Sequence, residues 1–326
     1  MKDKILVTGG LGMVGAFVCR ALIATGRHPV IYDLGTSTAL IRDIEARCTL
    51  VPGNVTDLPR LAGAIQAHRP QAIVHLGAAV GPGVEAHPWS SLQSNLLGTA
   101  TVFEAARLNG IQKVIFPSSK MVYGPVAERH RHPSYEPVPE AHPREPLKLY
   151  GKLKRACEDL AGHYAPLYSL DLVALRFGSA YAPGKFGTHG KVSPVMGLIE
   201  AAIAGRPMHI ASGAEQRDDL CYSGESANGV LAALQAPAMP GTFRVYNIAS
   251  GELISLGEMI QTLQALFPRW EGTAGPGLDY RNMGSGYYFA LSTAKARAEL
   301  AFTPQFDFRK AALDYQETLA RLSAQT

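Results

Sequence analysis

The chain has 326 residues, of which 47% are hydrophobic and 18% are charged, and its formal net charge is +4. This length can bury a sizeable core in one large domain or in two lobes. The charge is mildly positive without a basic stripe interleaved with aromatic residues, so no nucleic-acid binder is expected, and no apolar run reaches the roughly 18 residues of a membrane span.

Short β-branched runs alternate along the chain with segments that carry apolar residues at helical spacing. The expected strands are "KILVTG", "HPVIYDL", "TLVPGN", "AIVHLGA", "KVIFPSS" and "DLVALRF". The expected helices between them are "GAFVCRALIATG", "LPRLAGAIQAH", "SLQSNLLGTATVFEAARLNG" and "YGKLKRACEDLAGHYA". This alternation predicts a doubly wound α/β fold, in which helices cover both faces of a parallel sheet.

The alternation ends near residue 178. A Gly-rich loop, "GSAYAPGKFGTHGKVS", precedes a helix in "PVMGLIEAAIAG", and "FRVYNIAS" is typical of one more strand of the sheet. Short helices are expected in the C-terminal third. We therefore predict a nucleotide-binding Rossmann domain, residues 1–178 plus about 220–250, and a smaller substrate-binding lobe, residues about 179–219 plus 251–326.

Three glycines, Gly9, Gly12 and Gly15, lie between the first expected strand and the first expected helix. Such a pattern gives a tight turn and lets the backbone approach a pyrophosphate at a helix N-terminus. Asp33 ends the next strand, where a carboxylate can accept hydrogen bonds from the adenosine ribose and repels a 2′-phosphate. No Arg or Lys occupies positions 34–38. The expected cofactor is therefore NAD rather than NADP.

Three later segments follow expected strands, where such a fold lines its cofactor cleft. "GNVTD" places Asn54 and Val55 beside the adenine, and "HLGAA" offers small residues near the ribose and phosphates. "SSKMVYG" ends the fifth strand with two hydroxyls, those of Ser118 and Ser119. Each segment taken alone is also consistent with ordinary turn chemistry.

The segment "LKLYGKLKRACEDL" places Tyr150 four positions before Lys154 in an expected helix. Residues four apart lie on the same helix face, whereas Lys152 points to another face. The spacing therefore predicts either a phenol held beside an ammonium or, more commonly for this motif alone, a core aromatic residue beside a solvated lysine.

The cysteines and histidines suggest no metal site. Four widely separated cysteines without a C-x-x-C spacing favour free thiols in the cytoplasm over disulfides or zinc. Because the chain opens with the strand-like run "KILVTGG", no signal peptide is expected. His130 and His132 lie in "ERHRHPSYEP" without an evident third ligand, so a solvated loop is expected there.

Taken together, these motifs resemble the extended short-chain dehydrogenase/reductases, specifically the nucleotide-sugar epimerase/dehydratase group. The resemblance covers nearly the whole chain, and the motifs that carry it, in order, are "TGGLGMVG", Asp33, "GNVTD", "HLGAA", "SNLLGT", "SSKMVYG", "YGKLK", "LRFGSAYAPG" and "EQRDDLCYSGESANGV". It implies NAD as cofactor, a Rossmann domain with a small substrate lobe, and homodimers that pair two helices per subunit. Those helices would begin near Ser94 and Tyr150.

The resemblance also implies a catalytic trio of Ser119, Tyr150 and Lys154. In this view the charges of Lys154 and of NAD⁺ lower the pKa of the Tyr150 phenol, so that it can accept a substrate hydroxyl proton near neutrality. Ser119 would hold that hydroxyl, and Lys154 would also bond the nicotinamide ribose. The expected cofactor contacts are Gly9, Gly12, Met13, Val14, Gly15, Asp33, Asn54, Val55, Leu76, Ala78, Asn95, Ser118, Tyr150, Lys154 and Phe177.

The chain departs from its relatives at several positions. Dehydratases resemble "S-T-D-E-V-Y-G", whereas this chain has Lys120 and Met121 at the acid pair. Met121 can neither donate nor accept a proton, so dehydration and decarboxylation are disfavoured. Ser179 stands where epimerases carry an Asn that contacts the substrate diphosphate, and Val192-Ser193 replaces the usual "N-L" pair near the nucleotide base.

The expected substrate contacts are therefore only part of a diphosphate clamp. We expect them to be Ser119, Ser179, Arg217 and Arg281. Arg217 could instead pair with Asp218 or Asp219, and Lys185, His189 and Lys191 could supply further charge or simply be solvated.

Three functions remain open for a sugar-like, anionic substrate. Overall similarity favours a nucleotide-sugar 4-epimerase, and the altered clamp favours an NAD-dependent dehydrogenase of a non-nucleotide sugar, sugar acid or hydroxy acid. A catalytically silent NAD-binding regulator is the third, and the intact trio argues against it.

Overall fold

The computed structural model describes residues 3–184 and 194–323. Its centre is a seven-stranded sheet in the order β10-β6-β5-β4-β1-β2-β3, and every pairing within it is parallel. The predicted doubly wound α/β fold is therefore confirmed. Its strands are β1 (Lys4–Thr8), β2 (His28–Asp33), β3 (Thr49–Pro52), β4 (Ala72–His75), β5 (Lys113–Ser119), β6 (Asp171–Phe177) and β10 (Thr242–Ile248).

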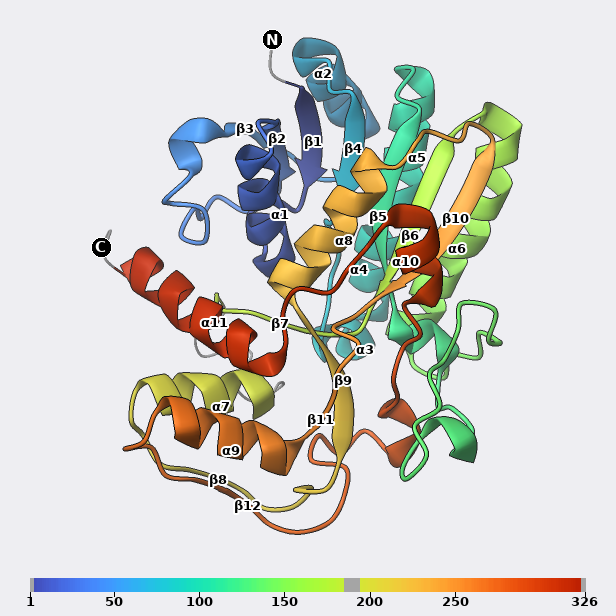
Figure 1. Cartoon of the computed structure of the whole chain (residues 1–326). Helices are drawn as coiled ribbons and strands as arrows, with labels where there is room; N and C mark the ends of the chain where they lie inside the picture. The colour runs from blue at the N-terminus through green and yellow to red at the C-terminus, as the bar shows by residue number, and fades with distance from the viewer. Residues whose placement is uncertain (1–2, 185–193, 324–326) are drawn as a thin grey trace.

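Helices cover both faces of this sheet, and each face has its own apolar core (Figure 1). One face carries α1 (Met13–Ala24) and α8 (Ser223–Gln235), which pack against each other. The opposite face carries α2 (Leu58–His68), α5 (Gly98–Leu108) and α6 (Leu149–Tyr168). Short helical segments complete this part of the chain: α3 (Gly83–Ala86), α4 (Pro88–Leu92), a π-helix (Gln93–Leu97) and 3-10 helices at Glu45–Arg47, Lys120–Tyr123 and Glu128–His130.

The second half of the chain adds two small sheets below the central one in the view of Figure 1. One has the strand order β11-β9-β7 and the other pairs β12 with β8. Their strands are β7 (Ser179–Tyr181), β8 (Met208–Ile210), β9 (Arg217–Tyr222), β11 (Leu253–Ser255) and β12 (Gly272–Ala274). The helices that accompany them are α7 (Pro194–Ile203), α9 (Leu256–Leu266), α11 (Phe308–Ser323) and a 3-10 helix at Ser285–Tyr287. Helix α10 (Ala294–Leu300) packs instead against β10 and α8 of the central sheet.

The second half differs from expectation in four elements. β9 and α8 were not predicted, because polar residues open both "RDDLCY" and "SGESANGV" and mask their burial in the fold. Helix α11 has 16 residues, longer than the short helices expected there. β7 forms within the segment predicted as a Gly-rich loop. The residue boundaries proposed for the two domains stay a prediction.

The turn between β1 and α1 depends on glycine. Gly9 has φ +71°, a backbone conformation that other residues rarely adopt. A Cβ on Gly15 would lie 2.2 Å from the Gly9 carbonyl oxygen, which is a backbone atom that cannot move aside easily.

Among the residues of the two described ranges, no helix is long and apolar enough to span a membrane.

We predict that Gly15→Ala destabilises the protein by about 1–3 kcal/mol, because the added methyl must displace backbone. The matched control is Gly63→Ala in α2, where a Cβ would meet nothing within 4 Å. Alanine in that open helical position should stabilise by about 0.5–1 kcal/mol. Urea unfolding of both variants measures the difference, and equal effects would contradict the close approach at Gly15.

Candidate active site

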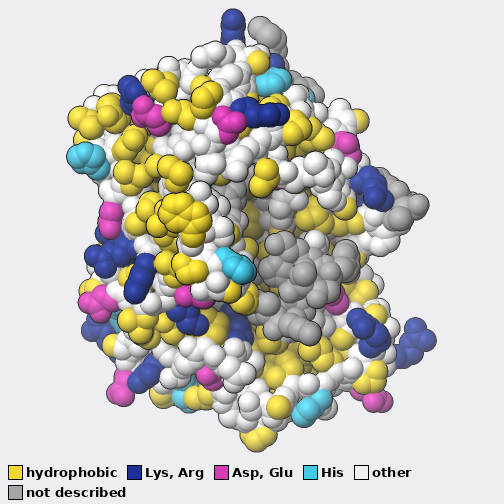
Figure 2. Space-filling view, turned by 180° about the vertical axis from the view of Figure 1, so that it is seen from behind, with side chains coloured by type: hydrophobic (Ala, Val, Ile, Leu, Met, Phe, Trp, Pro, Cys, Tyr) yellow, Lys and Arg dark blue, Asp and Glu magenta, His cyan; other side chains and the backbone are white. Residues whose placement is uncertain are grey.

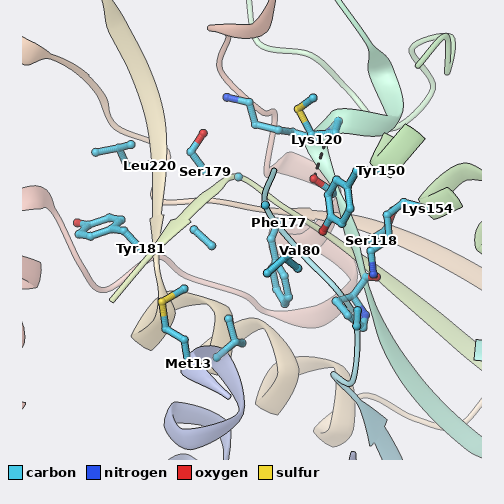
Figure 3. A pocket seen from close by; sticks show the side chains of 18 of the residues that line it. Met13, Val80, Ser118, Lys120, Tyr150, Lys154, Phe177, Ser179, Tyr181 and Leu220 are labelled. Atoms are coloured by element: carbon cyan, nitrogen blue, oxygen red, sulfur yellow. Dashed lines mark hydrogen bonds between the residues drawn. The ribbon is translucent and has the colours of Figure 1, made fainter. Parts of the chain in front are cut away.

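A cavity of about 410 Å³ lies at the carboxyl ends of the central strands, between the sheet and the second half of the chain. Figure 3 shows Tyr150 and Lys154 of α6 on one side of it. Ser179 of β7 and Leu220 of β9 lie on the other side, and Met13 of α1 lies beneath. Ligands of doubly wound sheets bind at this edge of the strands.

Most of the residues predicted to contact a cofactor line this cavity. They are Gly9, Gly12, Met13, Val14, Gly15, Leu76, Ala78, Ser118, Tyr150, Lys154 and Phe177. Asp33, Asn54, Val55 and Asn95 are not among the lining residues. The glycine turn and the ends of β1, β4, β5 and β6 thus meet at one place, as the sequence motifs indicated.

The surroundings of Asp33 fit an adenosine ribose. Its Oδ2 accepts a hydrogen bond from the Leu11 backbone N–H at 2.9 Å, and its Oδ1 accepts one from the Gly35 N–H at 2.9 Å. These bonds hold the carboxylate at the end of β2 and leave lone pairs on both oxygens for hydroxyl donors. Together with a glycine turn that leaves no room for a Cβ, the residues present fit NAD.

Asn54, Val55 and Asn95 have structural partners instead. Asn95 Oδ1 accepts from the Ala79 N–H at 2.7 Å, and Asn95 Nδ2 donates to the Ala79 carbonyl at 2.9 Å. Asn54 Oδ1 accepts from the Thr56 N–H at 3.1 Å. Val55 packs against the apolar core that lies under α2, α5 and α6. These residues shape the loops around the cavity, and their contact with a cofactor stays a prediction.

The three predicted catalytic side chains come together. Ser119, Tyr150 and Lys154 all line the cavity, and a hydrogen bond joins Ser119 to Tyr150. Lys154 Nζ donates to the Pro117 carbonyl at 2.8 Å and lies 5.7 Å from the centre of the Tyr150 ring. The i, i+4 spacing therefore brings the phenol and the ammonium to one wall of the cavity.

Burial is the largest influence on the pKa of Tyr150, and the expected effect of Lys154 together with NAD⁺ on that pKa stays a prediction. Burial raises the pKa of Tyr150 from 10.0 to about 12, and the hydrogen bond with Ser119 offsets only part of that rise. Burial also lowers the pKa of Lys154. The reason is that both groups are desolvated, and the ammonium hydrogen-bonds to Pro117 rather than to the phenol.

A buried ion pair fixes the helix that carries Tyr150 and Lys154. Glu158, one turn beyond Lys154, accepts two hydrogen bonds from Arg176 of β6, at 2.8 and 2.6 Å. It also accepts from Ser118 of β5 at 2.5 Å and from Arg144 at 2.9 Å. The carboxylate and the Arg176 side chain are almost completely buried. Helix α6 is thereby held against β5 and β6 at a defined register.

The N-terminus of α6 is held by a residue that sequence reasoning did not identify. Glu85 of α3 accepts hydrogen bonds from the backbone N–H groups of Leu149 and Tyr150, each at 3.2 Å. Free N–H groups at a helix start favour a carboxylate. The two segments are 64 and 65 residues apart in sequence, so no local pattern could have signalled this contact.

The predicted substrate contacts separate into two groups. Ser119, Ser179 and Arg281 line the cavity, whereas Arg217 does not. Arg217 Nη2 instead donates to Glu258 at 2.6 Å, and its Nη1 donates to the Leu253 carbonyl at 2.8 Å. Its ion-pair partner is thus neither Asp218 nor Asp219, the alternatives considered from the sequence. Lys185, His189, Lys191 and the Val192-Ser193 pair lie outside the described residues.

The His-rich loop, expected to be solvated, is exposed at His132 but not at His130, which is only 1% exposed. His130 Nδ1 contacts the Glu136 carbonyl at 2.8 Å, and His130 Nε2 accepts from Arg129 at 3.0 Å. In the described part of the chain, no three His, Cys, Asp or Glu side chains are grouped to hold a metal ion.

One residue that lines the cavity, Lys120, had no binding role in the sequence analysis.

Comparison with known proteins gives consistent results. A model of the family described as "NAD dependent epimerase/dehydratase family" matches residues 5–249. The chain is similar to the UDP-glucose 4-epimerase of Rhizobium meliloti (strain 1021), at 27% identity over 319 residues that cover 94% of each chain. It is also similar to a putative UDP-glucose 4-epimerase of Methanocaldococcus jannaschii, at 27% identity over 310 residues, 94% of this chain and 95% of the relative.

Solved structures share the fold. The structure of a UDP-glucose 4-epimerase from Thermotoga maritima with UDP-glucose matches with a TM-score of 0.83 at 22% identity, covering 98% of this chain and 99% of that one. A UDP-N-acetylglucosamine 4-epimerase from Methanobrevibacter ruminantium matches with a TM-score of 0.82 at 23% identity over 100% of both chains.

We predict that Arg176→Met destabilises the protein by about 3–5 kcal/mol, because it leaves the buried Glu158 carboxylate without its main partner. The control is Arg155→Met on α6, the helix that carries Glu158. The Arg155 pair with Asp159 has a separation of 3.7 Å and is half exposed. That change should cost less than about 1 kcal/mol. Urea unfolding measures both, and similar losses would refute a special role for the buried pair.

Proposed function

The chain belongs to the NAD-dependent epimerase/dehydratase family, and from that premise we propose that it oxidises and re-reduces a secondary hydroxyl of a sugar-like substrate, as a nucleotide-sugar 4-epimerase does. It is an NAD-dependent enzyme of the extended short-chain dehydrogenase/reductase type. The observation that carries the proposal is the meeting of Ser119, Tyr150 and Lys154 with the glycine turn around one cavity. The 4-epimerases among its relatives support the same activity.

In the proposed mechanism each side chain has a separate task. The glycine turn would hold the pyrophosphate of NAD, Asp33 the adenosine ribose and Lys154 the nicotinamide ribose. Bound NAD⁺ supplies a hydride acceptor for the substrate carbon and a positive charge near the phenol. Tyr150 Oη, ionised to the phenolate, accepts the proton of the substrate hydroxyl, and Ser119 Oγ orients that hydroxyl. Because burial raises the pKa of Tyr150 to about 12, this proton transfer needs the additional charge.

A second function is favoured by the position of Arg217. Its guanidinium is bound to Glu258 and Leu253 outside the cavity, so the clamp expected for a substrate diphosphate is incomplete. A dehydrogenase of a non-nucleotide sugar, sugar acid or hydroxy acid needs no such clamp. The two activities differ in the fate of the NADH that they form. A dehydrogenase releases it in proportion to the substrate consumed, and an epimerase keeps it bound. A catalytically silent regulator finds less support, because the complete trio lines the cavity.

We further propose that the protein is a homodimer. Large apolar side chains are exposed on the face formed by α4, the π-helix and α6: Trp89 is 71% exposed, Leu97 46% and Leu167 58%. Hydrophobic side chains gather between charged ones on the face seen in Figure 2. Pairing of α4, the π-helix and α6 with the same helices of a second subunit would bury Trp89, Leu97 and Leu167.

We also propose a cytoplasmic location, which the free state of all four cysteines supports.

Replacing Tyr150 with Phe removes the phenol oxygen and leaves the ring in place. We expect turnover to fall by about 10²-fold or more, because the group that exchanges the proton is lost. NAD affinity should stay nearly unchanged. The assay uses the sugar that most stabilises the NAD-bound protein in a thermal-shift screen of UDP-sugars, dTDP-sugars and free sugar acids.

The control for this experiment is Tyr164→Phe, on the same helix but away from the cavity. It should retain full turnover. Normal turnover of Tyr150→Phe would rule out the proposed role of the phenol, and NADH released in proportion to substrate would favour the dehydrogenase.

The dimer is tested by charge substitution on the exposed helical face. Trp89→Glu combined with Leu97→Glu should convert the dimer to a monomer in size-exclusion chromatography with light scattering, because buried carboxylates cannot be paired there. Met239→Glu, at a position 47% exposed in a loop before β10, is the control and should leave the mass unchanged. A monomeric wild-type protein would contradict the proposal.

A further inference from the structure

The wall of the cavity contains a buried cation to which no step of the proposed reaction assigns a task. Lys120 follows Ser119 directly, at the start of the 3-10 helix Lys120–Tyr123, and its side chain is only 4% exposed. Its Nζ donates to Asp218 Oδ1 at 2.9 Å and lies 4.7 Å from the centre of the Phe289 ring. In Figure 3 the side chain extends from above Tyr150 in the direction of Ser179.

The hydrogen bonding of Lys120 is incomplete by comparison with another buried lysine. Lys113 donates to the carbonyls of Ala233 and Ala236 and lies 3.6 Å from Asp171. Lys113 does not line the cavity, and its contacts with these protein groups give it a structural role. Lys120 has three N–H donors, and in the described ranges its one hydrogen-bond partner is Asp218. The remaining donors are available to a group in the cavity.

A second cation, Arg281, contacts the same carboxylate. Arg281 Nη2 pairs with Asp218 Oδ2, and Arg281 also lines the cavity. Its Nε atom is buried and, among the described residues, has no hydrogen-bond partner. Two cations thus share the single carboxylate that both of them contact. Two positive charges therefore contact one negative charge, and one additional negative charge would balance them.

Asp219 does not supply that charge by direct contact. Its Oδ2 accepts from the Leu291 N–H at 2.8 Å, and its Oδ1 accepts from Ser250 at 3.3 Å. It influences Lys120 only over a longer distance. Burial and the nearby Arg281 lower the pKa of Lys120 to about 7, as expected for an ammonium that lacks a full set of anionic partners. An anion bound between the two cations would reverse part of that effect.

We propose that Lys120 and Arg281 form a subsite for the carboxylate of a sugar-acid substrate, beside the hydroxyl that Ser119 and Tyr150 handle. This inference rests on the proposed function and specifies its substrate class. A carboxylate has two oxygens and one charge, which suits one ammonium and one guanidinium N–H. Because Lys120 adjoins Ser119, the anionic group belongs to the same sugar as the reacting hydroxyl.

A diphosphate matches this subsite less well than a carboxylate. A diphosphate carries at least two charges and would need both of the arginines expected to contact substrate, Arg217 and Arg281. Arg217 lies outside the cavity. The carboxylated sugar can be free or nucleotide-linked, since both offer the same group to Lys120. Binding of nucleotide-linked and free probes separates these two sources.

The test measures binding of matched probes to the NAD-bound protein by calorimetry. UDP-glucuronate and UDP-glucose differ only at C6, carboxylate against hydroxymethyl, as do glucuronate and glucose. In at least one pair, the carboxylated probe should bind about tenfold or more tighter. The pair that shows the preference identifies whether the substrate is nucleotide-linked or free.

Lys120→Met should remove this preference by weakening the carboxylated probe about tenfold or more while leaving the neutral probe unchanged. Lys113→Met is the matched control, a buried lysine outside the cavity, and it should lower the midpoint of thermal unfolding without changing the preference. Retained NAD affinity verifies that Lys120→Met is folded. If it is not folded, Arg281→Met replaces it and should give the same loss.

The subsite is refuted if neither carboxylated probe binds more tightly than its neutral partner, or if Lys120→Met weakens both members of a pair equally. The proposed function is judged separately, by the dependence of turnover on Tyr150. A Tyr150-dependent reaction without a carboxylate preference overturns this inference alone. A carboxylate preference that depends on Lys120, in a protein whose turnover does not need Tyr150, overturns the proposed chemistry and leaves the subsite in place.

Discussion

The buried ion pair between Glu158 and Arg176 fixes the geometry on which the rest of the site depends. Two hydrogen bonds, at 2.8 and 2.6 Å, join helix α6 to strand β6, and a third at 2.5 Å joins it to Ser118 of β5. Such a pair is costly to break, because each charge is desolvated and depends on the other. Since Tyr150, Lys154 and Glu158 recur every four residues, fixing one of them fixes where all three face.

Two further contacts hold the surroundings of this helix. Glu85 binds the first N–H groups of α6, and Asn95 binds both backbone groups of Ala79 in the loop between β4 and α3. The loop that lines the cavity and the helix that carries the phenol are therefore held to one another. In both of these contacts a carboxylate or amide side chain bonds to backbone groups, an arrangement that tolerates little change in geometry.

Burial sets the charges of the site more strongly than proximity does. Desolvation raises the pKa of Tyr150 and lowers the pKa of Lys154, although the two groups lie on one helix face. Desolvation also lowers the pKa of Lys120. The position of Lys120 beside Ser119 is evident in the sequence, but its burial is not. Whether a charged residue near a site is solvated, paired with another residue or available to a ligand depends on desolvation, and a sequence gives no direct measure of it.

The amino-acid sequence was sufficient to predict the alternation of strands and helices, the glycine turn, the acidic end of β2 and the spacing of Tyr150 and Lys154. These features are local: they depend on backbone preference, hydrophobic period and turns of one helix. Tertiary structure alone decided that Arg217 pairs with Glu258, that Glu85 binds the start of α6, and that Lys120 meets Asp218 across 98 residues of chain. Those contacts arise from the packing of distant segments, and a charged residue carries no local signal of which partner it will find.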